Sequence, residues 1–146
     1  MDITRSPSKI RTTRKTITFT GAAGVGEAGT AVTVYSVVGN IYLHALICYC
    51  TTLLTESGAT ATVSLGTASQ VTRFIGNTNS VEIDANEIWV STTPTVGSID
   101  LPDAMQSVVI TNGDDIIVNP LTTNTTGGVL QFVMFWEPVS TDGTAS

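Results

Sequence analysis

The residues of this chain that could carry out catalysis are few and badly placed for it. Nucleophilic catalysis needs a base beside the nucleophile, and the only histidine, His44, lies in the most apolar stretch, IYLHALICYCTTLL. No serine stands in a GxSxG elbow. Cys48 and Cys50 would lie about 7 Å apart on one face of a strand, too far for a disulfide and without further ligands for a metal. We therefore expect buried free cysteines, no catalytic residue and no metal site.

Two other motifs resemble ligand-binding sites but lack features that such sites need. Gly24 to Gly29 matches GxGxxG, but a dinucleotide site needs a helix to begin within the glycines. The sequence that follows, TAVTVYSVV, is β-branched and favours a strand. The acidic groups Glu82/Asp84/Glu87 and Asp114/Asp115 lack the spacing of a calcium-binding loop and are typical of turns. We expect no cofactor.

The sequence around these residues predicts short β-strands. Apolar and polar residues alternate with period two, and Gly, Asn and Pro punctuate them about every ten residues. Antiparallel hairpins are predicted at Gly39-Asn40 and at Asn112-Gly113. In the last strand, Leu130, Phe132, Met134 and Trp136 are predicted to form the core face. The predicted strands span residues 16–20, 30–38, 41–54, 59–65, 70–75, 87–91, 95–101, 107–111, 115–119 and 129–137.

Composition agrees with an all-β protein. The chain has 146 residues, of which 42% are hydrophobic and only 12% charged, which excludes coiled coils and helical repeats. We predict a single antiparallel β-sandwich or barrel, jelly-roll-like, over residues 16–138. An extended N-terminal arm (1–15) precedes it and a polar C-terminal tail (139–146) follows. No secretory signal and no membrane span is recognised, so we expect a soluble protein made in the cytoplasm, or a mature chain whose signal has been removed.

Charge is distributed unevenly. The first fifteen residues hold five of the six basic residues and one acid, a net charge of +4, whereas the remainder holds Arg73 and eleven acids, a net charge of −10. An acidic body would repel phosphate, so we expect no direct binding to nucleic acid. The arm itself could contact an acidic protein surface. Its candidate contact residues are Arg5, Lys9, Ile10, Arg11, Arg14 and Lys15.

Four segments give the chain a resemblance: ITFTGAAGVGEAGTAVTVYSVVGNIYLHALICYC, GATATVSLGTAS, VEIDANEIWVSTTP and LQFVMFWEPVSTDG. The sequence resembles small β-rich virion structural proteins of tailed bacteriophages and is similar to capsid decoration, or cement, proteins. That resemblance implies a non-enzymatic protein on the virion surface that clamps adjacent coat subunits. It also implies the major capsid protein as partner and a homo-oligomer, with a trimer favoured.

Two other functions remain open. A tail, head-fibre or receptor-binding module of a virion would show an aromatic or carboxylate patch on an exposed loop and would need the basic arm less. A carbohydrate-binding or pilin-type module would need a secretion signal. If the arm binds the capsid, removal of residues 1–15 is expected to leave the β domain folded and to weaken attachment.

Overall fold

The computed structural model describes residues 9–21, 24–58 and 60–146. Its regular elements are ten β-strands and two short 3-10 turns, and the all-β prediction is confirmed. No helix in the described part of the chain is long and apolar enough to cross a membrane. In chain order the elements are β1 (Arg11–Thr18), β2 (Val32–Tyr35), β3 (Val37–Val38), β4 (Ile41–Glu56), β5 (Thr62–Thr67), β6 (Ile75–Asn79), η1 (Ser80–Glu82), η2 (Asp103–Met105), β7 (Gln106–Ile110), β8 (Ile116–Leu121), β9 (Thr125–Pro138) and β10 (Thr144–Ala145).

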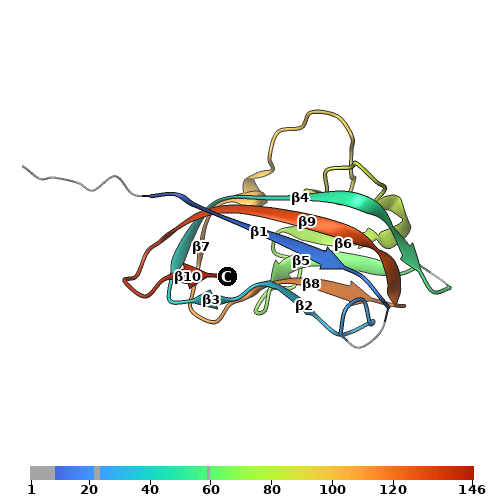
Figure 1. The fold of residues 1–146 in the computed structure, drawn as a ribbon, viewed down its shortest axis with the longest axis horizontal. Helices are drawn as coiled ribbons and strands as arrows, with labels where there is room; N and C mark the ends of the chain where they lie inside the picture. Colours follow the sequence, from blue (N-terminus) through green and yellow to red (C-terminus); the bar gives the residue numbers. More distant parts are fainter. Residues whose placement is uncertain (1–8, 22–23, 59) are drawn as a thin grey trace, which may run out of the picture.

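Eight of the strands form two four-stranded antiparallel sheets, in the orders β1-β9-β4-β7 and β2-β8-β5-β6 (Figure 1). Pairing proceeds from the ends of the chain inward: β1 pairs with β9, β2 with β8, β4 with β7, and β5 with β6. This wrapped order is that of a jelly roll, in which one long antiparallel ribbon is folded over into two sheets. The strands β3 and β10 pair separately.

One hydrophobic core is shared by the two sheets. The four residues predicted as the core face of the last strand, Leu130, Phe132, Met134 and Trp136, are at most 3% exposed. From β4 they meet Leu46, Cys48 and Cys50, and the second sheet adds residues such as Tyr35, Val63, Leu65 and Val118. Side chains in a strand point alternately to its two faces, so the spacing of two along β9 turns all four residues inward.

The N-terminal boundary of the domain differs from the prediction. The strand predicted at Thr16 begins at Arg11, and β1 pairs with β9 from Arg11 opposite Trp136 to Thr18 opposite Val129. Residues Arg11 to Lys15, assigned to the arm from their charge, are therefore part of the first sheet. Strand pairing uses backbone groups, so charged side chains are tolerated on the exposed face of a strand at the edge of a sheet.

Both predicted hairpins are wrong in their pairing. A turn does form at Asn112-Gly113, where Asp114 N donates to Thr111 O at 3.1 Å. However, β7 pairs with β4 and β8 pairs with β2 and β5, so this turn carries the chain from one sheet to the other. At Gly39-Asn40, similarly, β3 pairs with β10 whereas β4 pairs with β7 and β9.

Three other predicted segments are corrected. The C-terminal tail contains β10, which pairs with β3 and buries Ala145. The strand predicted at 70–75 is mostly turn, and β6 begins only at its last residue, Ile75. Instead of two strands at 87–91 and 95–101, the chain makes isolated bridges at Ile88 and then a long loop.

Deletion tests the new position of the N-terminal boundary. Removing residues 1–15 should take away five of the eight residues of β1 and lower the free energy of unfolding by at least about 3 kcal/mol, through lost ladder and side-chain hydrogen bonds. Removing residues 1–8, which leaves β1 whole, should cost much less. Urea unfolding followed by tryptophan fluorescence measures both values, and equal stability of the two truncations would contradict the assignment of β1 to the domain.

Candidate interaction surfaces

The basic residues singled out from the sequence lie along one edge of the first sheet. Among the described strands, β1 has only β9 beside it. Arg11 and Arg14 are exposed and Lys15 is half-buried, while Lys9 and Ile10 are exposed just before the strand. Arg5 lies outside the described residues. The structure thus presents the described part of the predicted arm as a basic strand edge, which we call the basic edge (Lys9, Ile10, Arg11, Arg14).

Side-chain contacts fix this edge to the domain. The Arg11 guanidinium carbon lies 5.2 Å from the centre of the Trp136 ring, which is within reach of a cation–π attraction. The indole Nε1 of Trp136 donates to Thr13 Oγ1 at 2.9 Å. From the second sheet, the Tyr35 hydroxyl donates to the backbone oxygen of Thr13, also at 2.9 Å. Thr13 is therefore held from both sheets, and the edge is rigidly positioned.

Tyr35 can donate that hydrogen bond only while it keeps its proton. Burial, followed by the nearby Cys48 thiol, raises the pKa of Tyr35 well above its ordinary value, and Arg14 opposes the shift. Burial has this effect because the phenolate would lose its hydration. The hydroxyl remains a donor throughout the physiological pH range.

His44 is partnered by a carboxylate at the surface. Its Nε2 lies 3.1 Å from Glu137 Oε1, with side-chain exposures of 31% and 23% for the two residues. The Tyr42 ring packs edge-on against the imidazole, with ring centres 4.7 Å apart. No cysteine is part of this contact, because Cys48 and Cys50 face the core. The arrangement is a histidine–carboxylate hydrogen bond on the outer face of β4 and β9.

The two cysteines are free and buried, as the sequence predicts. Burial, with Cys50 as a second cause, raises the pKa of the Cys48 thiol. Burial raises the pKa of Cys50 to about 11, although a hydrogen bond with the backbone of Thr52 opposes the shift. Thiols react as thiolates, so neither cysteine is a strong nucleophile at neutral pH.

The acidic clusters bond to the chain around them. Asp84 N donates to Glu87 Oε2 at 2.8 Å. Asp115 Oδ1 accepts from Val37 N at 2.7 Å, and Asp114 accepts from both the N and Oγ of Ser69. Among the described residues, no three His, Cys, Asp or Glu side chains gather into a site that could hold a metal ion. The main role of these carboxylates is to hold loops in place through hydrogen bonds.

The GxGxxG segment is a loop packed against the start of β9. Gly26 has φ of +107°, and a Cβ atom there would lie 2.1 Å from Thr125 O. Its own carbonyl accepts from Thr125 N at 2.8 Å, and Ala28 N donates to Asn124 Oδ1 at 3.0 Å. The glycine at this position serves close backbone packing, and no helix follows it.

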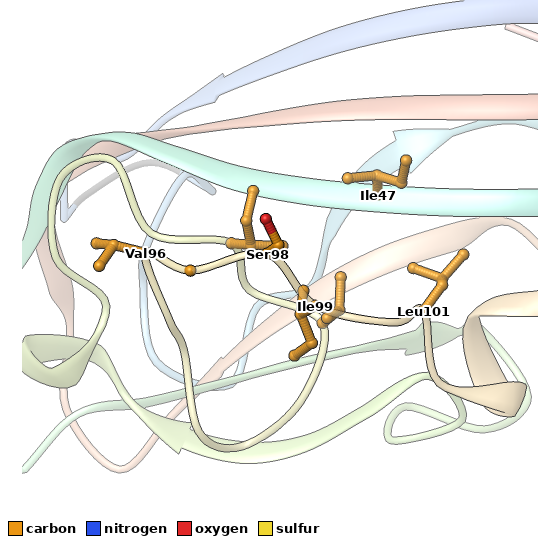
Figure 2. A pocket seen from close by; sticks show the side chains of 8 residues that line it. Ile47, Val96, Ser98, Ile99 and Leu101 are labelled. Atoms are coloured by element: carbon orange, nitrogen blue, oxygen red, sulfur yellow. The ribbon is translucent and has the colours of Figure 1, made fainter.

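A groove that the sequence did not reveal lies between β4 and the long loop that bridges to it at Ile88 (Figure 2). Its volume is about 470 Å³. Its lining combines one residue of β4 with residues of the long loop before β7: Ile47, Ile88, Val90, Val96, Gly97, Ser98, Ile99 and Leu101. We call it the apolar groove. The only sequence signal for it is a run of aliphatic residues, Val96, Ile99 and Leu101, in a segment interrupted by Pro94 and Gly97.

Alkaline pH should lower the free energy of unfolding through the ionisation of Tyr35 in the unfolded chain. Above pH 10.0, the ordinary pKa of tyrosine, the unfolded chain loses the Tyr35 proton while the folded chain keeps it, so stability falls as pH rises. Tyr35→Phe should cost about 0.5–1.5 kcal/mol near pH 8, because Thr13 O loses its donor. It should also lose less stability than the wild type between about pH 8 and about pH 10.5. Urea unfolding at both pH values tests this, and parallel losses in the two proteins would exclude Tyr35 as the titrating group.

Comparison with known proteins gives a likeness of fold. No protein-family model matches the sequence, and no curated protein matches it significantly. A chain in the capsid asymmetric unit of cyanophage Pam1 aligns with 94% of this chain and 91% of its own length, with a TM-score of 0.51 and 15% identity. A chain in the capsid of Ralstonia phage GP4 aligns with 97% of this chain and 92% of its own, with a TM-score of 0.44 and 16% identity. This chain therefore has the same overall fold as the chain from the Pam1 capsid structure.

Proposed function

We propose that this protein is a non-enzymatic decoration, or cement, protein of a tailed-bacteriophage virion. It would bind the outer surface of the head and clamp adjacent coat subunits. The observation that carries the proposal is the fold, which matches a chain of the Pam1 capsid structure along nearly the whole length of both chains. A basic edge on an otherwise acidic domain supports it, because this charge asymmetry suits attachment to an acidic protein surface.

Clamping follows from ordinary binding linkage. A protein that binds only the assembled junction between two coat subunits stabilises the assembled shell against its dissociated parts. The basic edge supplies Lys9, Arg11 and Arg14 with the exposed aliphatic side chain of Ile10. Exposed ion pairs contribute only about 0.2–1 kcal/mol each, so several must act together with apolar contact. The major capsid protein is the proposed partner, and a homotrimer is the proposed assembly of the decoration protein itself.

A tail, head-fibre or receptor-binding module is the second candidate. The observation in its favour is the apolar groove, which lies at an exposed loop whose sequence places carboxylates next to lining residues. Electron microscopy of the native particle, with this chain located in it, decides between the two. Density for the chain on the head supports decoration, and density confined to the tail or a fibre overturns it.

Charge reversal tests the basic edge. Arg14→Glu should weaken binding to shells that lack the protein, and the wild type should bind less tightly as salt rises, because ionic strength screens exposed charges beyond about 8–10 Å. Arg73→Glu is the matched control, since Arg73 is the one basic residue outside the first fifteen and lies in a turn beside β6. Sedimentation of shells with bound protein measures occupancy. Equal occupancy for both variants at low salt would contradict attachment through the basic edge.

A further inference from the structure

The apolar groove is built on a fixed framework. The Trp89 ring is fully buried, and its Nε1 donates to Thr78 Oγ1 at 3.1 Å. Ile88 and Thr95 exchange two backbone hydrogen bonds, at 2.7 and 3.2 Å. At the far end of the loop, Met105 is fully buried. A loop held at both ends requires little ordering when a partner binds, which favours affinity.

The rim of the groove exposes aliphatic side chains to water. Val96 is 74% exposed and Ile99 is 45% exposed. A single exposed aliphatic residue is ordinary, but these two stand over a hollow lined by further aliphatic residues, Ile47 and Leu101 (Figure 2). Such a gathered apolar surface on a fixed loop is typical of a contact site for another protein.

The charged residues that neighbour the lining residues in sequence are all acidic. Glu87 directly precedes the lining residue Ile88, Asp100 stands between Ile99 and Leu101, and Asp103 follows two residues later. The sequence has no Lys or Arg after Arg73. A complementary partner segment therefore carries aliphatic side chains next to Lys or Arg.

The chain itself contains such a segment, but in each copy it is largely engaged. From Arg11 onward it is paired with β9, Arg11 lies over Trp136, and Thr13 is held by side chains from both sheets. A second copy could offer only the residues before β1. This favours a different protein as the occupant.

The groove and the basic edge lie on opposite sides of the β9–β4 pair in the first sheet. The basic edge is on β1, and β9 and β4 separate it from Ile88, which bridges to Tyr49 on the other side of β4. A clamp needs two separate contact surfaces, one for each subunit that it joins. We propose that the apolar groove is the second contact of the clamp and takes an extended coat-protein segment with aliphatic side chains next to Lys or Arg, an inference that rests on the proposed decoration function.

A substitution at the rim tests the contribution of the groove. Val96→Asp adds an unpaired charge to the rim without disturbing the core, because Val96 is largely exposed. We expect about a tenfold rise in the dissociation constant for shells lacking the protein. Val71→Asp is the control, a matched change at a 40%-exposed valine in the turn before β6. If the wild type does not bind shells, the decoration function fails. If the wild type and both variants bind equally, only the groove proposal fails.

Crosslinking identifies the occupant. Cys48 and Cys50 are buried, so an added Ser98→Cys in the groove can be labelled selectively with a maleimide photocrosslinker. Irradiation on shells should give an adduct with the coat protein, mapped by mass spectrometry to a peptide with aliphatic residues beside Lys or Arg. Thr72→Cys, at an exposed turn away from the groove, should give no adduct with that peptide. An adduct between two copies of this chain, or no coat adduct from Ser98→Cys while the labelled protein remains bound, would overturn the proposal.

Discussion

The pairing of β9 with β1 on one side and β4 on the other determines the rest of this structure. The β1–β9 ladder joins residues that are more than one hundred positions apart in sequence, such as Thr13 and Met134. Once it forms, the alternation along β9 turns its large apolar residues toward the second sheet. It also places the basic residues of β1 at one edge and leaves the far side of β4 for the loop that builds the groove. Contacts of such sequence separation cost chain entropy before they contribute stability, so slow folding is the natural consequence of this topology.

The charged residues of β1 protect an exposed strand edge, and they are also the residues that we propose for binding. An unprotected edge strand pairs readily with another chain, and charged side chains are one of the ways in which proteins prevent this. With Arg11 and Arg14 on β1, an approaching β1 of a second copy meets like charge. A partner with acidic groups meets attraction at the same place. The charge that opposes self-pairing would therefore also select the proposed acidic partner.

Local sequence patterns predicted the features of the fold that depend only on neighbouring residues, namely which side chains are buried. The inward alternation of β9 and the burial of both thiols could be predicted, because burial follows side-chain period and apolar content. The pairing partners could not. Asn112-Gly113 specifies a reversal of direction, and nothing in the turn states that the next strand joins the other sheet. Arg11 to Lys15 resembled a tail because an edge strand needs no apolar face of its own. The apolar groove escaped notice since Ile47 and Ile99 meet only through the fold.

Two modest contacts are sufficient for a clamp if they act together. The basic edge offers a few exposed charges, each worth little alone, and the groove offers a small apolar surface. Once one contact is made, the second forms within a single complex at a high effective concentration, so the combined affinity exceeds either one without any new interaction. The added affinity depends on rigid contact surfaces, because flexible surfaces would lose conformational entropy when they become ordered on binding. Thr13, tied to both Tyr35 and Trp136, and Trp89, tied to Thr78, supply that rigidity on opposite sides of the β9–β4 pair. The spacing between the two proposed contacts is thereby fixed by the strands, so in the proposed clamp only coat subunits assembled at the matching distance would satisfy both.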